Sequence, residues 1–380
     1  MESDGRHRAA PSDKESFMLP EPILDYLPKP FHKVDYGIGL IGAGGIAEIG
    51  HIPAYKKAGY HVLAVADVAE ERRRYAQDTF GLDSQMVFDD HRRLLDLPSI
   101  DIVDITLPHL SPHKIPIVHD AIDAGKHVLV EKPLAMNYQD AKDVVDHAAR
   151  AGVKLAVCHQ YRWMPVFRAT KNLIDQGCLG NLFLVSMDER WAYDVPGLSY
   201  SQQPQVLFLI ESIHFIDEFR WWTGLEPRQV FASISRRPDQ AIRGDTVGSL
   251  ILDMHDNLRV VYTGNIASHH QSQRLRYRLE GTGGVLNAHF DDLWGPGGLE
   301  YSPAGSGASW FRPVLTGQGF PDGFFGLMGD LMESIAEDRE PAVSGKDNLK
   351  TLQIVFAAYR SAELGRTVAP SEITATERSE

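Results

Sequence analysis

The feature that most constrains the fold is a glycine-rich turn between an apolar run and the start of a helix, near the beginning of the chain. Residues 36–41 include the apolar run of a buried strand, and Gly42-Ala-Gly44-Gly45-Ile46-Ala47 follows it. Gly42 permits a tight turn, Gly44 lets the backbone approach a pyrophosphate, and Ala47 is small enough for helix and strand to pack closely. The free amides and dipole of the helix N-terminus favour an anion. The stretch predicts a phosphate-binding turn, which the rest of the chain has to support.

An acidic residue at the end of the next expected strand supplies that support. Residues 61–67 form a second apolar strand that ends in Asp67, 20 residues after Ala47. This is close to the spacing of the ribose-binding acid in dinucleotide folds. A carboxylate accepts hydrogen bonds from ribose hydroxyls and repels a 2′-phosphate, so the sequence favours NAD over NADP. The alternative for Asp67 is a simple strand-end cap, and Arg72 to Arg74 are interpreted as a solvated helix face.

Strands and helices then alternate as far as residue 160, which predicts a parallel sheet. Further strands are expected at 87–88, 100–106, 126–130 and 154–159, with helices between them. Ligands bind outside the carboxyl ends of such strands, so residues at or after these ends are candidates for cofactor binding. The predicted cofactor-binding set is Gly42, Gly44, Gly45, Ile46, Ala47, Asp67, Thr106, Leu107, Pro108, His113, Glu131, Lys132, Gln160 and Arg162.

The pattern changes after residue 160. From about Leu182 the expected strands are longer and seldom separated by helices, and the Gly/Pro/Ser-rich residues 295–319 are expected to form a surface loop. We predict an extended N-terminal arm (1–35, its first part disordered), an α/β Rossmann domain with a doubly wound parallel sheet (36–160), an α+β domain with a large, mostly antiparallel open sheet for substrate binding and oligomerisation (161–370), and a tail (371–380). The last helix, 348–364, is expected to pack back on the Rossmann domain. The arm is expected to lie against its own domain or a neighbouring subunit, with a loose leader as the alternative.

Composition and charge exclude several classes of protein. The 380 residues carry 38 Lys and Arg against 51 Asp and Glu, a formal net charge of −13 that argues against a nucleic-acid partner. Two cysteines cannot build a disulfide framework. This low cysteine content favours a reducing cytoplasm. No secretory signal and no stretch long enough for a membrane span is evident. The open sheet and the apolar arm suggest a homo-oligomer, a dimer or tetramer.

Two further motifs carry the chemistry. Glu131-Lys132-Pro133 directly follows the strand at 126–130, where a lysine can hydrogen-bond a substrate hydroxyl or the forming carbonyl. His214-Phe-Ile-Asp217 lies within an expected helix at 204–222. Together with residues 42–47, residues 125–133 and Gln160-Tyr-Arg162, these motifs resemble the family of glucose–fructose oxidoreductases, inositol dehydrogenases and MocA proteins (Gfo/Idh/MocA). The resemblance covers about residues 36–366.

The resemblance implies a two-domain fold with bound NAD or NADP and hydride transfer at a hydroxyl-bearing carbon of a sugar or polyol. It places Lys132 and His214 at the reacting centre as catalytic residues, whereas the alternative for His214 is a buried histidine bonded to a carbonyl. Many polyol dehydrogenases of the family carry an aspartate four residues before this histidine, where this chain has Ile210. Glu211 either replaces that acid in catalysis or is a helix-surface carboxylate.

The predicted substrate-binding set is Lys132, Arg162, Trp163, Trp191, Glu211 and His214. The tryptophan rings could stack on a sugar face, although packing is the commoner use of such rings. We predict no metal, because the adjacent His269 and His270 would face opposite ways on a strand. Two other functions remain open. One is glycoside cleavage or elimination assisted by tightly bound NAD, and the other is a non-catalytic sensor that binds a dinucleotide.

Overall fold

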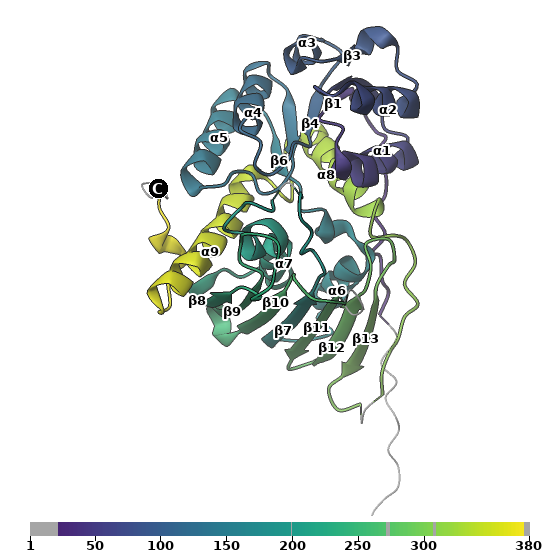
Figure 1. The fold of residues 1–380 in the computed structure, drawn as a ribbon. Coiled ribbons are helices and arrows are strands. Elements are labelled where there is room, and N and C mark those ends of the chain that lie inside the picture. Colours follow the sequence, from purple (N-terminus) through teal and green to yellow (C-terminus); the bar gives the residue numbers. More distant parts are fainter. Residues whose placement is uncertain (1–21, 199, 271–273, 307–308, 376–380) are drawn as a thin grey trace, which may run out of the picture.

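The computed structural model describes residues 22–198, 200–270, 274–306 and 309–375. The expected disorder at the start of the chain and the end of the predicted tail lie outside these residues. Two sheets organise the molecule, and Figure 1 shows them one above the other with helices between and around them. We call residues 36–160 the first domain and residues 161–370 the second domain.

The first domain is built on a six-stranded, fully parallel sheet with the strand order β3-β2-β1-β4-β5-β6. This order, with the reversal beside β1, is that of a Rossmann fold, and it confirms the predicted fold class. The strands are short and consist almost entirely of buried apolar residues, as expected for a sheet covered on both faces. They span β1 (Ile38–Ile41), β2 (Val62–Ala66), β3 (Val87–Phe88), β4 (Ile102–Ile105), β5 (His127–Val130) and β6 (Leu155–Val157).

The connecting helices lie between the strands, as the sequence predicts, and one of them is irregular. The helix after the glycine turn starts as a π-helix over Ala47–His51 and continues as α1, in which Pro53 stands at the start and lacks an amide hydrogen. Gly81 and Gly152 end two of the helices in the left-handed conformation. The helices are α1 (Ile52–Ala58), α2 (Glu70–Phe80), α3 (His91–Leu95), α4 (Lys114–Asp123) and α5 (Tyr138–Ala151).

The second domain is built on a seven-stranded sheet with the order β13-β12-β11-β7-β10-β9-β8. Neighbouring strands of this sheet run antiparallel, except for β7 and β10, which are parallel. Along most of its strands, buried residues alternate with partly or fully exposed ones, which is typical of a sheet with one face towards solvent. The strands are β7 (Leu182–Arg190), β8 (Pro227–Ser235), β9 (Val247–Met254), β10 (Arg259–Asn265), β11 (Leu275–Gly281), β12 (Gly284–Phe290) and β13 (Gly298–Pro303).

One strand of this sheet corrects the expected surface loop at 295–319. β13 pairs with β12, and Tyr301 is buried with its hydroxyl donating to the Cys178 carbonyl at 2.8 Å. The Gly- and Pro-rich flanks hid a strand whose alternate side chains, Leu299 and Tyr301, point into the core.

Helices of the second domain lie between the two sheets. α6 (Pro165–Asp175) and α7 (Ile213–Thr223) pack on each other, and the turn before α7 is a π-helix over Leu207–Glu211. α8 (Asp322–Ala336) returns to the first domain and packs on α1. α9 (Gly345–Leu364) contacts α5 of the first domain as well as α7 and β8, so the last helix bridges both domains. The Val157 amide donates to the Val343 carbonyl at 2.9 Å, which extends the edge of the first sheet.

The described part of the N-terminal arm packs against both domains of its own chain. Phe31 and Tyr26 are buried, and the Tyr26 hydroxyl accepts from the Thr316 amide at 2.8 Å. The Phe31 amide donates to the Tyr60 hydroxyl at 3.2 Å. Ile23, by contrast, is 84% exposed. Among the described residues, no helix has the length and apolar character to cross a membrane.

Candidate active site

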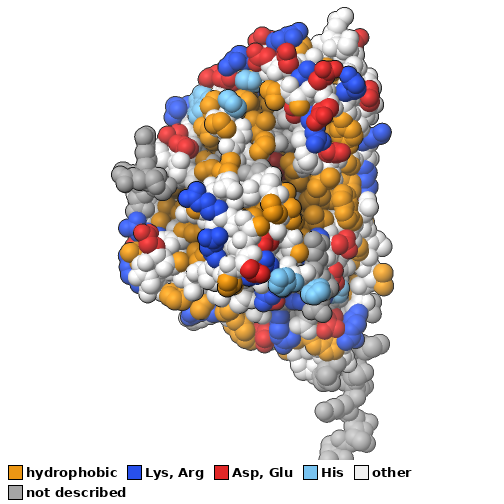
Figure 2. All heavy atoms as spheres, viewed as in Figure 1, with side chains coloured by type: hydrophobic (Ala, Val, Ile, Leu, Met, Phe, Trp, Pro, Cys, Tyr) orange, Lys and Arg blue, Asp and Glu red, His pale blue; other side chains and the backbone are white. Residues whose placement is uncertain are grey.

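A large cleft lies at the carboxyl ends of the parallel strands, where the second domain faces the first. Its volume is about 1150 Å³. In the space-filling view, apolar side chains gather across the middle of the molecule, between the charged upper rim of the first domain and the second domain below (Figure 2). Most predicted cofactor residues line this cleft: Gly42, Gly44, Gly45, Ile46, Asp67, Thr106, Leu107, Pro108, His113, Glu131, Lys132 and Gln160.

The glycine turn forms a cradle that a side chain would fill. Gly42 has a φ of +91°, a left-handed conformation that favours glycine, and the Thr106 hydroxyl donates to its carbonyl at 2.6 Å. A Cβ atom on Gly44 or Gly45 would meet no protein atom within 4 Å, and neither residue has a left-handed φ. Among the glycines of the described residues, these two alone combine both properties. Contacts within the protein therefore do not require glycine there, and the turn leaves room for a ligand close to the backbone.

Asp67 and Ala47 complete the turn. The Asp67 carboxylate accepts from the Ala43 amide at 2.7 Å and from the Ala69 amide at 2.8 Å, and it lines the cleft. It is thus a cap of the turn as well as a candidate for ribose binding, and its remaining lone pairs are available to ribose hydroxyls. Ala47 is fully buried and does not line the cleft, in agreement with its predicted role in helix–strand packing.

Behind the Glu131-Lys132 motif lies a buried network of charged groups. His51 lies between two carboxylates, with Nδ1 2.7 Å from Asp104 and Nε2 2.9 Å from Glu131. The Tyr55 hydroxyl also donates to Asp104, at 2.6 Å. Burial alone would lower the pKa of His51, but Asp104 and Glu131 raise it to about 9, so the ring is an imidazolium that donates from both nitrogens. Burial alone would raise the pKa of Glu131, but His51 and Lys132 lower it to about 2.

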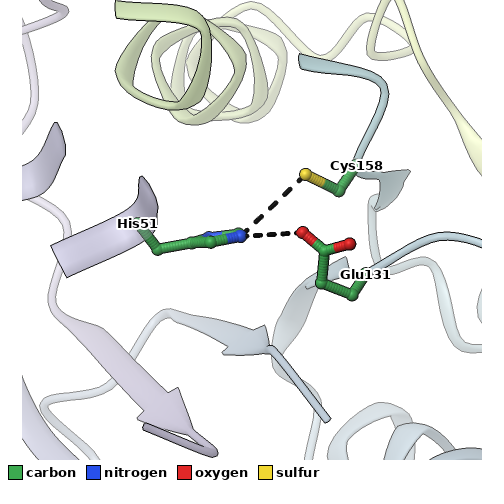
Figure 3. Close-up of side chains that lie close together, drawn as sticks. All are labelled: His51, Glu131 and Cys158. Atoms are coloured by element: carbon green, nitrogen blue, oxygen red, sulfur yellow. Dashed lines mark hydrogen bonds and ion pairs between the residues drawn. The ribbon is translucent and has the colours of Figure 1, made fainter. Parts of the chain in front are cut away.

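A histidine, a glutamate and a cysteine of this network also have the grouping of a metal site. Figure 3 shows His51 pointing at Glu131 and Cys158, and the three potential ligand atoms lie within 4.8 Å of one another. Both nitrogens of His51 already donate to carboxylates, and burial raises the pKa of the Cys158 thiol well above its usual value. Hydrogen bonding accounts for the group, and the absence of a metal stays a prediction.

This network makes a testable contribution to stability. Because the folded-state pKa of His51 is raised, its charge stabilises the fold fully below about pH 6.5, and this contribution is lost as the pH rises through about 9. We expect the free energy of unfolding, measured by urea denaturation from pH 6 to pH 9.5, to fall more steeply in the wild type than in His51→Gln. His61→Gln, at an exposed position of the same domain, is the control. If the free energy of unfolding falls equally steeply with pH in the wild type and in His51→Gln, His51 is not charged between Asp104 and Glu131 in the folded protein.

Lys132 connects the two domains. Its side chain is buried, and Nζ donates to the Ile210 carbonyl in the π-helix of the second domain at 2.6 Å. A second buried lysine, Lys114, donates to the Pro133 carbonyl at 2.5 Å, and burial lowers its pKa to about 8. One lysine thus ties the loop after β5 to α4 of its own domain, and the other ties it to the second domain. Ile210 stands where an aspartate is expected from the resemblance, and its backbone oxygen supplies the acceptor for Lys132.

His214 lies on the opposite wall of the cleft, at the start of α7. Its ring stacks on Tyr161 with centroids 4.4 Å apart and an interplanar angle of 5°. Nδ1 is buried with no partner among the described residues, which leaves Nε2 as the nitrogen available to a ligand. Burial and the charge of Lys132 lower the pKa of His214 well below its usual value, so the imidazole is neutral at neutral pH.

Glu211 also lines the cleft, at the end of the π-helix. Burial raises the pKa of its carboxyl, and the charge of Lys132 opposes this rise. Glu211 is partly exposed, and it shares the cleft with Lys132. Of the two interpretations from the sequence, the structure places Glu211 in the cleft rather than on the helix surface.

Besides Ala47, the structure leaves three predicted site residues outside the cleft lining. Arg162 is buried in ion pairs with Asp217, from Nε at 2.6 Å and from Nη2 at 2.7 Å, and with Asp347 at 2.9 Å. Trp163 packs tightly on Gly326 of α8, and Trp191 is buried under Tyr193. Contacts with other protein side chains hold each of these three residues away from the cleft surface.

Several cleft residues are absent from the predicted set. The sequence could have indicated His109, which follows Pro108 at the same strand end. Its Nδ1 is buried with no partner among the described residues, and burial and Lys132 lower its pKa well below the usual value. Further residues come from the second domain, where the sequence gives no comparable rule: Tyr161, Tyr193, Leu198, Tyr200, Leu293 and Phe320. The first domain also adds residues that the predicted set lacks, among them Arg72, Asp89, Asp90, His91, Arg92 and Asp120.

Comparisons with known proteins agree with this architecture. The family model described as "Oxidoreductase family, NAD-binding Rossmann fold" matches residues 36–159, and "GFO/IDH/MocA C-terminal domain" matches residues 167–287. Over 342 residues the chain is 28% identical to D-apiose dehydrogenase of Paraburkholderia graminis, covering 87% of this chain and 88% of that protein. It is 26% identical to myo-inositol 2-dehydrogenase of Thermotoga maritima, covering 88% and 99%.

A solved structure shows the same fold over nearly the whole length. The aldose–aldose oxidoreductase of Caulobacter crescentus, complexed with glycerol, superposes with a TM-score of 0.78 at 24% identity. The match covers 88% of this chain and all of that chain.

Proposed function

The chain belongs to the GFO/IDH/MocA family of oxidoreductases, and we propose that it transfers a hydride between the hydroxyl-bearing carbon of a sugar or polyol and a nicotinamide dinucleotide. The observation that carries this proposal is the position of Lys132 and His214, which line one cleft with the glycine turn and Asp67. The named relatives, which act on apiose and inositol, support a carbohydrate substrate.

The cofactor would be held by Gly42, Gly44, Asp67 and the residues that follow β4 and β5. Gly44 and Gly45 leave the space that a pyrophosphate needs, and the Asp67 carboxylate can accept from ribose hydroxyls. When bound, the nicotinamide supplies the hydride acceptor or donor.

The protein's own groups handle the proton and the charge. A substrate hydroxyl between Lys132 and His214 can give its proton to His214 Nε2, because the histidine is neutral. As the C–H bond breaks, negative charge grows on that oxygen, and the Lys132 ammonium stabilises it with a hydrogen bond. Lys132 has to exchange its bond to the Ile210 carbonyl for one to the substrate. Glu211, beside Lys132, can help to orient the ammonium or a second substrate hydroxyl.

The assay that tests this function follows reduction of NAD with a broad panel of sugars and polyols. We expect turnover with at least one neutral member of the panel. Absence of turnover across the panel, in protein shown to bind NAD, would contradict the proposal.

We propose NAD rather than NADP as the cofactor. Four carboxylates line the cleft near Asp67, and the two arginines there are paired with acids, Arg72 with Glu48 at 2.6 Å and Arg92 with Asp90 at 3.6 Å. A 2′-phosphate would meet net negative charge. The carboxylates are Asp67, Asp89, Asp90 and Asp120.

We expect kcat/KM with NAD to exceed that with NADP by about tenfold or more, since one well-placed charge is worth one to two kcal/mol in a partly buried site. Asp67→Ser should narrow this ratio, and Asp78→Ser, at an exposed position of α2, should leave it unchanged. Comparable rates with both cofactors in the wild type would contradict the assignment.

We also propose a homo-oligomer in the cytoplasm. The helices cover one face of the second sheet (Figure 1), and on β8 the large apolar side chain of Phe231 is 39% exposed between the buried Val230 and Ala232. Light scattering on the purified protein measures the assembly directly, and a monomer at micromolar concentration would contradict it.

A further inference from the structure

We propose that the substrate is an uncharged sugar or polyol whose ring lies against tyrosine side chains, and that Glu211 and Tyr193 select it. The inference rests on the proposed function, because it concerns the same cleft. It comes from the side chains that face Lys132 from the second domain. These are Tyr161, Tyr193, Leu198, Tyr200, Glu211, His214, Leu293 and Phe320.

The cleft has a cofactor end around Asp67 and a substrate end around Lys132 and His214, and the charged groups are distributed unequally between them. Most belong to the elements around Asp67 in the first domain, and Glu131 is bound to His51. Among the described residues that line the substrate end, Lys132 is the one cation and Glu211 the one free carboxyl. Charge at this end therefore balances before any substrate enters.

The histidines at this end do not supply further positive charge. Burial lowers the pKa of both His109 and His214 well below the usual value, and the charge of Lys132 lowers it further. Both rings are neutral at neutral pH. They can exchange hydrogen bonds with hydroxyl groups, but they cannot neutralise a carboxylate or a phosphate.

A negatively charged substrate would lack a partner here. A carboxylate or phosphate that leaves water needs a paired cation, usually an arginine with its two-pronged geometry. Lys132 is engaged at the reacting hydroxyl, and Glu211 would repel the anion. Arg162 and Arg274 do not line the cleft: Arg162 pairs with Asp217 and Asp347, and the Arg274 guanidinium lies 4.3 Å from the centre of the Trp191 ring.

The remaining surface suits the C–H face of a sugar ring. Tyr161 is fixed by stacking on His214, and Tyr193 by stacking on Trp191 at 5.0 Å and 7°. Rings held in this way lose little freedom when a ligand stacks on them. Leu293 and Phe320 add apolar surface, while the tyrosine hydroxyls can meet sugar hydroxyls at the ring edge.

Matched substrates that differ in one charged group test this proposal. For glucose, galactose and mannose, the neutral aldose is compared with its uronate and its 6-phosphate, with NAD reduction as the readout, and neutral polyols extend the panel. We expect kcat/KM of the neutral member to exceed that of either charged member by about a hundredfold, the size expected for an unpaired buried charge. A charged member that reacts as well as its neutral counterpart would overturn the inference and leave the oxidoreductase activity standing. No turnover with any neutral or charged compound would remove the proposed function and this inference with it.

Two variants assign the selection to residues. Glu211→Gln should raise the ratio of uronate to aldose kcat/KM about tenfold by removing the repelling charge. Glu363→Gln, which makes the same change of charge at an exposed position of α9, should leave the ratio unchanged. Tyr193→Leu should raise KM for the neutral sugar about tenfold, with a smaller change in kcat, as expected for lost ring stacking. An unchanged ratio in Glu211→Gln would show that Glu211 does not select the substrate. An unchanged KM in Tyr193→Leu would show the same for Tyr193.

Discussion

Replacement of Lys132 by methionine is expected to lower kcat/KM about a thousandfold or more, because the variant loses the cation that stabilises charge on the reacting oxygen. Methionine keeps much of the length and the apolar stem of lysine. It removes the hydrogen bond to the Ile210 carbonyl, so part of the contact between the domains is lost as well. The affinity for NAD, measured by calorimetry, should fall far less than turnover.

Lys142→Met is the matched control for this experiment. Lys142 is a partly exposed lysine of α5 in the same domain, paired with Asp146 one helical turn later. This variant should keep wild-type activity. If Lys132→Met folds, binds NAD and retains a tenth of wild-type kcat/KM, Lys132 does not act at the reacting centre.

The second large effect is expected at Gly44. Gly44→Val should leave the thermal stability of the cofactor-free protein nearly unchanged, because a Cβ there meets no protein atom within 4 Å. The same substitution should weaken NAD binding about a hundredfold or more, because a branched side chain stands where the backbone has to approach the pyrophosphate.

Gly44→Ala should give an intermediate loss of affinity. Ala151→Val adds a branched side chain at an exposed position of the same domain and should not affect NAD binding. A Gly44→Val protein that binds NAD like the wild type would show that the cradle is not the pyrophosphate site. A protein that loses stability without NAD would show instead that glycine serves the fold.

The first domain was predictable because its signals are local. The apolar strands, the glycines that end helices and the polar residues after strand ends follow one another over short stretches of sequence. Gly42, Thr106 and Lys132 could therefore be assigned to one edge of the sheet before any contact was known. His109 obeys the same rule and could have been included.

The second domain was harder because its decisive contacts are distant in sequence. Arg162 follows a strand end, as a site residue should, but its partners are Asp217 and Asp347. The tyrosines of the cleft, Tyr161, Tyr193 and Tyr200, follow no sequence pattern that separates them from aromatic residues of the hydrophobic core. Lys132 donates to the backbone carbonyl of Ile210, and such a bond could not be predicted from the identity of the Ile210 side chain.

The most direct test of the central claim is the fate of the hydrogen on the oxidised carbon. A neutral sugar from the panel, deuterated at its carbon positions, is incubated with NAD, and the reduced cofactor is examined by mass spectrometry. The account predicts one deuterium in each reduced nicotinamide and a slower rate than with the undeuterated sugar. Reduced cofactor without deuterium, or an altered sugar with no net reduced cofactor, would contradict direct hydride transfer, and the second result would point to cleavage or elimination by tightly bound NAD.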